Sequence, residues 1–269
     1  MILSRQSKLS LILLSVIFVP LLKPCSSYAK TGIIVALNGT SDQIRSAMNV
    51  TCTRHYAQRE FIIGTLSDTD IVLTRSPMGM INNAITTQVL IARFGVQRII
   101  SIAPAGALAD QLKIGDLIMA SQVWQHDFGT VKPYGFIWGK APDGSGSHSL
   151  GYQQPDRAML EIAQNTSEQI KVSENRCYKG IVASGDSFIA DNDKKRWIVK
   201  KFDAVAVDMG AAAIAQVCYA NRIPCLILRM ITDKADINAR VDFTDSLPSY
   251  RSDIDINGYL SLLLKAMAH

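Results

Sequence analysis

Short apolar runs alternate with amphipathic segments along most of this chain, and that alternation limits the folds it can adopt. The runs have the length of strands, and the segments between them repeat apolar residues at helical spacing. The clearest expected strands are residues 32–37, 61–66, 71–75, 98–103, 117–123, 180–184, 205–208 and 225–230, and the clearest expected helices are residues 81–94, 155–169, 211–219 and 254–268. Alternation of this kind favours an α/β fold. We expect a single domain with a central mixed, mostly parallel sheet flanked by helices.

The first 29 residues have the order of a secretory signal peptide. Arg5 and Lys8 precede an apolar run over residues 9–22, and small residues follow up to Ala29. The run is shorter than the roughly 20 residues of a comfortable membrane span, although an uncleaved anchor remains an alternative. The sequence therefore predicts export, either to the periplasm or out of the cell, with no stable membrane association after cleavage. The mature domain would cover residues 30–269.

Loss of that segment would change the charge balance. Of the 28 basic residues, Arg5, Lys8 and Lys23 lie in it and no acidic residue does, so the formal net charge would fall from +5 to +2. No dense tract of lysine and arginine remains in the mature chain. The charge pattern therefore argues against nucleic acid as a partner.

Cysteine usage leaves two alternatives open. Cys218 and Cys225 lie in apolar stretches, where a buried thiol is the ordinary state. Cys52 and Cys177 lie in polar surroundings, and an exported protein can pair such residues in a disulfide. No Cys-x-x-Cys pair and no cluster of histidines indicates a metal site.

Small or glycine-containing segments follow several of the expected strands. They are residues 74–80, 103–107, 184–189, 207–211 and 232–233. In an open α/β sheet the carboxyl ends of the strands form the edge at which ligands bind, and small residues let a flat ligand approach the backbone there. Asp233 follows the apolar run 223–228 at this edge. Apolar walls around such a carboxylate would raise its pKa and make it a proton donor.

The order and the amino-acid sequences of these segments resemble those of the nucleoside phosphorylase/nucleosidase superfamily, and most closely those of the 5′-methylthioadenosine/S-adenosylhomocysteine nucleosidases. The likeness covers nearly all of the mature chain, and its densest matches are residues 105–108 with 112–116, 184–189, 207–215 and 229–236. The resemblance implies hydrolysis of the N-glycosidic bond of a small-molecule, adenine-like nucleoside. It also implies a homodimer that needs no metal and no organic cofactor.

The resemblance implies roles for individual residues. The aspartate that protonates or hydrogen-bonds purine N7 falls on Asp233. The aromatic residue that stacks on the base falls on Phe188, and the neighbour whose backbone holds the edge of the base falls on Ile189. The positions expected beside the sugar are Met209, Ala105 and Gly106.

The chain departs from the family pattern at two acidic positions. Thr40 stands where the family has a glutamate near the attacking water, and Gly210 stands where a second glutamate binds the ribose hydroxyls. Pro104 also replaces a small polar residue before Ala105. A threonine cannot act as the general base that a carboxylate would be. Asp42 and Asp208 are the candidates to take over from these glutamates.

Two further functions therefore stay open beside hydrolysis. One is a non-catalytic or weakly active nucleoside- or purine-binding protein, which the loss of both glutamates favours. The other is a phosphorolytic enzyme, in which phosphate replaces water. Phosphate would need convergent basic groups, and Arg45 and Arg75 are the nearest candidates.

Residues 124–152 have no clear periodicity and are rich in glycine, proline and aromatic residues. A segment of this length favours a functional loop that closes over the site or meets a partner subunit. His126 lies at the start of this segment and could reach the substrate. The more common role of such a histidine is packing in the interior or a place at the surface.

Overall fold

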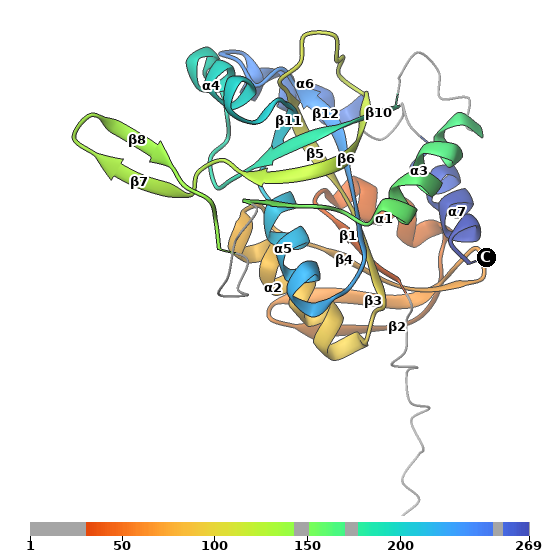
Figure 1. Ribbon diagram of the computed structural model, residues 1–269. Helices are drawn as coiled ribbons and strands as arrows, with labels where there is room; N and C mark the ends of the chain where they lie inside the picture. Colours follow the sequence, from red (N-terminus) through yellow and green to blue (C-terminus); the bar gives the residue numbers. More distant parts are fainter. Residues whose placement is uncertain (1–30, 143–150, 170–176, 250–254, 269) are drawn as a thin grey trace, which may run out of the picture.

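The computed structural model of the chain describes residues 31–142, 151–169, 177–249 and 255–268 (Figure 1). The predicted signal peptide, residues 1–29, lies outside the described residues. Within the described ranges, no helix combines the length and the apolar character needed to cross a membrane.

A mixed sheet forms the centre of the fold, as the sequence predicts. In spatial order its strands are β11 (Ala204–Asp208), β10 (Cys177–Ser184), β6 (Leu117–Gln125), β12 (Cys225–Asp233), β5 (Arg98–Ala107), β1 (Thr31–Val35), β4 (Thr69–Arg75), β3 (Arg59–Leu66) and β2 (Asn49–Tyr56), and the short β9 (Tyr152–Gln153) pairs with β6. The pairs β1–β4, β1–β5, β5–β12, β6–β10 and β10–β11 are parallel. The hairpin pairs β2–β3 and β3–β4, together with β6–β12, are antiparallel.

Strand β5 takes part in two different regions of the sheet. Its first residues pair with β1 and β12, whereas Gly106 and Ala107 near its end pair antiparallel with Val207 and Ala206 of β11. The strands β5, β12, β6, β10 and β11 therefore close into a ring. Closure brings the carboxyl end of β11 next to the carboxyl end of β5, where the candidate ligand-binding residues lie.

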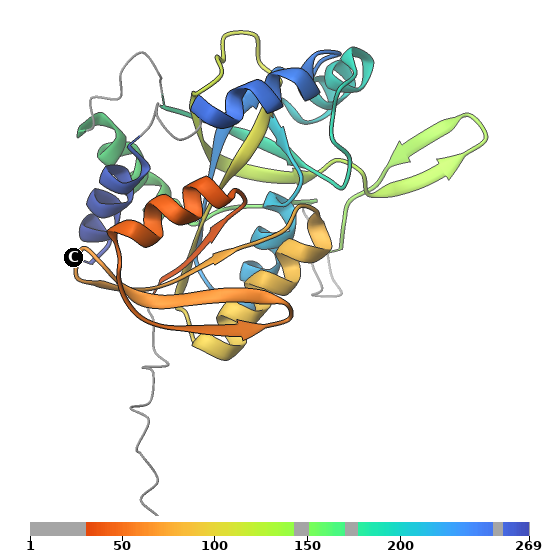
Figure 2. The ribbon, with the colours of Figure 1, turned by 180° about the vertical axis from the view of Figure 1, so that it is seen from behind.

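Helices cover both faces of the sheet (Figures 1 and 2). On one face α2 (Met80–Phe94) packs against α5 (Ala211–Asn221), with side chains such as Leu90 and Ile214 in one core cluster. On the other face α7 (Ile256–Ala266) packs against α1 (Asn38–Ala47) and α3 (Arg157–Gln169), in a second cluster that includes Leu263. The helix α4 (Asn192–Phe202) contacts β10 and β11, and α6 (Ala239–Ser249) contacts β12.

The segment 124–152 differs from the expected loop. It extends β6 to Gln125 and then forms an antiparallel hairpin of β7 (Gly129–Lys132) and β8 (Gly135–Trp138), which projects from the body of the protein (Figure 1). Trp138 anchors the base of the hairpin, because its ring packs against Trp124 and Phe202. Residues 143–150 lie outside the described part of the chain.

Of the two alternatives for the cysteines, the structure excludes a disulfide between Cys52 and Cys177. Cys177 is a free, half-buried thiol, whereas Cys52 is disulfide-bonded. Cys52 lies on β2 at one end of the sheet, and Cys177 begins β10 near the other end, so the strand order separates them. Burial raises the pKa of the Cys177 thiol, which keeps it protonated.

A buried ion pair joins the ring of strands. The Nε of Arg229 on β12 lies 2.6 Å from Oδ2 of Asp208 at the end of β11, and the two side chains are only 1% and 2% exposed. The Nη1 of Arg229 also donates to Oγ of Ser101 on β5 at 3.1 Å and to the carbonyl of Leu228 at 2.7 Å. Asp208 Oδ2 accepts a second hydrogen bond from the backbone N–H of Ala211, the first residue of α5, at 2.9 Å. The pair thus holds three strands and one helix in register.

We predict that Asp208→Asn lowers the free energy of unfolding by about 3–5 kcal/mol, because it leaves the Arg229 guanidinium buried without a counter-charge. Urea denaturation of both proteins measures the difference. The matched control is Asp193→Asn, which removes an exposed partner of Arg196 and should cost less than about 1 kcal/mol. Equal losses in the two variants would contradict the assigned importance of the buried pair.

Candidate active site

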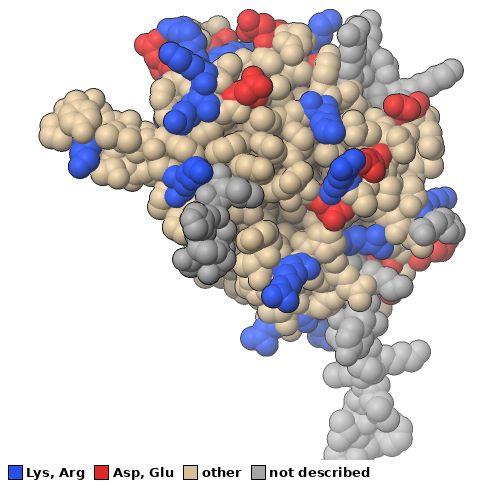
Figure 3. Space-filling model, in the orientation of Figure 1, with Lys and Arg blue, Asp and Glu red and all other residues tan. Residues whose placement is uncertain are grey.

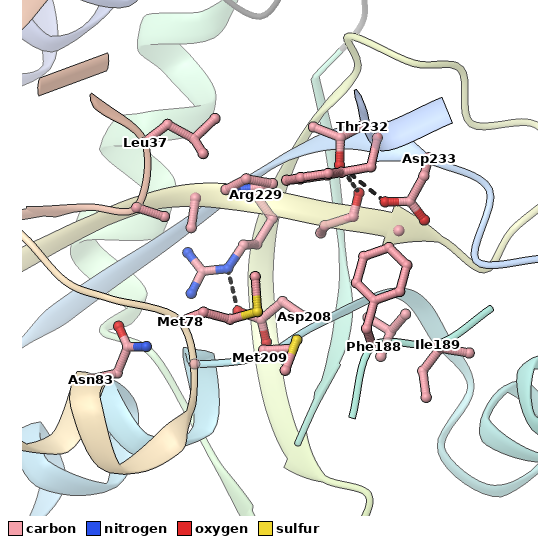
Figure 4. Close-up of a pocket in the computed structure, with 18 of the residues that line it drawn as sticks. Leu37, Met78, Asn83, Phe188, Ile189, Asp208, Met209, Arg229, Thr232 and Asp233 are labelled. Atoms are coloured by element: carbon pink, nitrogen blue, oxygen red, sulfur yellow. Dashed lines mark hydrogen bonds and ion pairs between the residues drawn. The ribbon is translucent and has the colours of Figure 1, made fainter. Parts of the chain in front are cut away.

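A single cavity collects all five of the small-residue segments that the sequence singles out. It lies where β5, β11 and β12 end, beside the loops that follow β1, β4 and β10. Its lining comprises residues 36–37, 76–78, 103–106, 187–189, 207–210 and 232–233, with Asn83, Arg229 and Phe243. Every predicted contact residue is among them: Asp233, Phe188, Ile189, Met209, Asp208, Ala105 and Gly106. Figure 4 shows how these side chains converge from separate elements.

Asp233 is the last residue of β12 rather than the first residue beyond it, and it is 3% exposed. Its Oδ1 accepts a hydrogen bond from the backbone N–H of Ala235 at 2.9 Å, and its Oδ2 accepts one from the Thr232 hydroxyl at 3.1 Å. Burial raises the pKa of Asp233, and the nearby carboxylates of Asp242 and Asp236 raise it further, against the opposing effect of the two hydrogen bonds. The carboxyl group therefore keeps its proton to a higher pH than an ordinary aspartate, as a proton donor requires.

Gly106 makes room for this carboxyl group. A Cβ at position 106 would lie 2.6 Å from Oδ1 of Asp233 and 3.0 Å from the Cβ of Ala235. The pairing of β5 with β12 shifts register at this point, so that Asp233 stands opposite Gly106. The sequence predicts a place for Gly106 beside the sugar, and the structure adds that the Asp233 carboxyl group packs directly against it.

Aromatic side chains form one wall of the cavity beside Asp233. Phe188 is 37% exposed, and its ring meets the ring of Phe243 edge to face, with centroids 6.0 Å apart. Ile189 next to it is buried, and the guanidinium of Arg240 lies 5.9 Å from the Phe188 ring centroid. A flat, partly exposed ring at a cavity mouth suits stacking on a planar ligand. Phe243 comes from α6, a helix that the sequence does not predict.

Polar side chains line the opposite end of the cavity. Figure 4 shows the Arg229 guanidinium and Asn83 on this side, with Met78 and Met209 between them and the end that holds Phe188 and Asp233. Sequence reasoning missed both polar residues as parts of the site. The sequence does contain one indication for Arg229, because a charged residue inside an otherwise apolar strand needs a buried partner.

Among the described residues, none brings a free carboxylate to the cavity in place of the two family glutamates. Thr40 is buried in α1, where its hydroxyl has no hydrogen-bond partner among the described residues. Asp42 is exposed, and it lies outside the cavity lining. Asp208 does line the cavity, but its carboxylate is bound by Arg229 and by the amino end of α5. Of the described lining residues, only Asp208 and Asp233 are acidic.

The basic residues considered for phosphate also lie elsewhere. Arg45 pairs with Glu60 at 3.6 Å on the protein surface, and Arg75 is exposed. Neither residue lines the cavity. Arg229 is therefore the sole lysine or arginine in the described lining, and Asp208 already neutralises it.

His126 is an interior residue and not a contact of the cavity. It is fully buried, and neither ring nitrogen has a hydrogen-bond partner among the described residues. A Cβ at Gly185 would lie 2.7 Å from its Nε2, so the ring packs directly against that backbone. Burial lowers the pKa of His126, which keeps the imidazole neutral.

Comparison with known proteins agrees with this geometry. A 5′-methylthioadenosine/S-adenosylhomocysteine nucleosidase of Shewanella oneidensis is 33% identical over 80% of this chain and 88% of its own length, and that of Staphylococcus epidermidis is 29% identical over 88% and 99%. Among solved structures, the Neisseria meningitidis enzyme of the same name, in complex with methylthio-immucillin-A, is 28% identical with a TM-score of 0.77 over 88% of this chain and 99% of its own. Futalosine hydrolase of Helicobacter pylori is 27% identical with a TM-score of 0.74 over 89% and 97%. Residues 30–254 match the family described as the phosphorylase superfamily, and the chain belongs to that superfamily.

Proposed function

We propose that this protein hydrolyses the N-glycosidic bond of an adenine-like nucleoside. The observation that carries the proposal is the buried carboxyl group of Asp233, whose pKa is raised, beside an exposed aromatic face in one cavity. The relatives named as nucleosidases, and the similar futalosine hydrolase, support this reaction class. Methylthioadenosine- and adenosylhomocysteine-like nucleosides are the substrates that those names favour.

Asp233 and the aromatic wall lie where they could assist departure of the base. As the bond between the sugar and the base breaks, its electron pair moves onto the base, and the Asp233 proton neutralises the ring. The sugar passes through an oxocarbenium-like state that a water molecule captures at the anomeric carbon. The water releases one proton to solvent, and Asp233 regains a proton, so that the products are a free base and a free sugar.

On the nucleophile side, the described lining residues offer no free carboxylate to activate the water. Thr40 offers no base, Asp42 lies at the surface, and the Asp208 carboxylate is held by Arg229. A positioned general base typically contributes a factor of about 10² to 10⁴ in rate. We therefore expect slow turnover, driven mainly by protonation of the base.

A nucleoside- or purine-binding protein with negligible turnover is the second candidate, and the same missing carboxylate favours it. Incubation of the purified protein with methylthioadenosine, adenosylhomocysteine, adenosine, inosine and futalosine, with and without phosphate, separates the candidates. Base release without phosphate supports hydrolysis, and release only with phosphate supports phosphorolysis. Tight binding without base release under any condition supports the binding protein.

We predict that Asp233→Asn lowers the rate of base release by about 10²- to 10⁴-fold, because an amide cannot donate the proton that the departing base needs. The same variant should be more stable than the wild type at neutral pH. The native state binds the Asp233 proton more tightly than the unfolded chain does, because the pKa of Asp233 is raised on folding. The free energy of unfolding of the wild type therefore falls as the pH rises above the ordinary aspartate pKa of about 3.9 and through the raised pKa of the folded state.

Thermal denaturation between pH 4 and pH 8 measures that effect. The stability of Asp233→Asn relative to the wild type should be smallest at pH 4 and should increase towards pH 7. The matched control is Asp245→Asn, which makes the same substitution at an exposed position of α6 outside the cavity lining. A constant difference for Asp233→Asn would show that Asp233 has an ordinary pKa.

We infer that the protein forms a homodimer and that the β7–β8 hairpin contributes to its interface. Val131 and Tyr134 on this hairpin are 82% and 79% exposed. On the face shown in Figure 3 the hairpin carries almost only uncharged side chains, whereas charges of both signs are scattered over the rest. A projecting apolar surface of this kind is typical of a protein–protein contact.

We predict a sedimentation mass of twice the chain mass for the wild type and a shift towards monomer for Val131→Glu, because the new charge would be buried in the interface. Thr130→Glu is the matched control, since successive side chains of a strand point to opposite faces. A monomeric wild type would contradict the dimer, and equal behaviour of the two variants would contradict the assigned face.

Export remains a proposal, supported by the signal-peptide order of residues 1–29. We predict that residues 1–35 carry a fused reporter out of the cytoplasm of a bacterial host. The same fusion with Leu13→Arg and Leu14→Arg should stay inside, because the charges interrupt the apolar run. Cell fractionation measures both, and a cytoplasmic wild-type fusion would refute export.

A further inference from the structure

A side chain at Gly210 would meet the side chain of Asn83, whereas the backbone at this position does not require glycine. It is the N-cap residue of α5, and its φ of −167° is an extended value that any residue adopts. A Cβ at this position would lie 2.4 Å from Nδ2 of Asn83 and 2.7 Å from its Cγ. The volume that a side chain at position 210 would occupy is therefore taken by the amide of Asn83.

Asn83 is fixed in that position by the first turn of α2. Its Nδ2 donates to the carbonyl of Gly79 at 2.9 Å and to the carbonyl of Pro77 at 3.5 Å. Because both partners are carbonyls, the amide nitrogen must face them, and this defines the orientation of the group. Its Oδ1 accepts no hydrogen bond within the described part of the chain, although the residue lines the cavity. Asn83 thus brings a neutral amide whose oxygen has no partner within the described part of the chain to the lining of the cavity.

The position of Asn83 indicates which part of a nucleoside it meets. Phe188 and Asp233 occupy one end of the cavity, where the planar base would stack and receive a proton. Asn83 lies at the other end, on the side of the Arg229 guanidinium (Figure 4). A nucleoside that places its base against Phe188 therefore directs its sugar towards Asn83.

We propose that Asn83 is a specificity-determining residue that accepts a hydrogen bond from a sugar hydroxyl, and that Gly210 exists to give it room. The inference rests on the proposed function, because it takes the ligand to be a nucleoside. An amide acceptor is neutral, and neutral hydrogen bonds stabilise a complex less than those to charged groups. The site therefore favours ribonucleosides over their deoxy analogues only modestly.

The test compares adenosine with 2′-deoxyadenosine and 3′-deoxyadenosine, using kcat/KM for adenine release. The wild type should prefer adenosine over one of the two analogues by about three- to tenfold. Asn83→Ala should lose that preference, because activity on adenosine falls while activity on that analogue stays within about twofold. A purely structural role for Asn83 would lower all three activities alike and leave the preference intact.

Gly210→Ala provides a second, independent variant. Its methyl group displaces the Asn83 amide, so it should remove the same preference by itself. In the Asn83→Ala background, Gly210→Ala should lower kcat/KM by less than about a further twofold, because the group that it displaces is already absent. The control is Asn221→Ala, which removes an amide contact to Gln88 between α5 and α2, away from the cavity, and should leave the preference unchanged.

The outcomes separate this inference from the proposed function. If the wild type releases adenine and Asn83→Ala keeps the full preference, the role of Asn83 is refuted while the proposed function stands. If no nucleoside is cleaved, the proposed function fails. In that case the dissociation constants of the same three ligands are measured by calorimetry. The preference for adenosine over the deoxy analogue must then be smaller in Asn83→Ala than in the wild type.

Discussion

The ion pair between Arg229 and Asp208 is the interaction on which the rest of the structure depends. It joins the carboxyl end of β11 to β12 and, through Ser101, to β5, with both charged side chains almost fully buried. The same carboxylate binds the first N–H of α5, the position favoured for negative charge at a helix amino end. Two buried charges are costly unless each is fully paired, so the strands and the helix have one arrangement in which both are satisfied. That arrangement also places Met209 and Gly210 at the cavity.

The cavity is equipped unequally at its two ends. At one end, burial raises the pKa of Asp233 beside an aromatic wall, and Gly106 leaves space for its carboxyl group. At the other end, Asp208 is the one acidic residue of the described lining besides Asp233, and its carboxylate is bound by Arg229. The proposed reaction therefore depends on activation of the leaving group. At this end the amide of Asn83, a neutral group, lies beside Gly210.

Much of this site was predictable because its residues follow strands. Asp233 and the pairs at 105–106 and 208–209 lie at or directly after strand ends, and the pair 188–189 follows β10 by a few residues. The parallel pairing of β5 with β12 brings two of these strand ends to one edge of the sheet, as expected for an α/β fold. Asn83 and Phe243 were not predictable in this way. They lie on helices, whose approach to the cavity depends on how α2 and α6 dock, and neither position carries a local signal.

The sequence by itself determined the α/β class, the mixed sheet and the segments that form the cavity, because periodicity and strand-end residues are local properties of the chain. Only the tertiary structure decided the return of β11 onto β5, the free thiol at Cys177, the projecting hairpin and the interior place of His126. Each of these depends on which distant segments become neighbours. The same holds for Asp233: its position near a strand end can be read from the sequence, but its raised pKa follows from burial that only the packed fold creates.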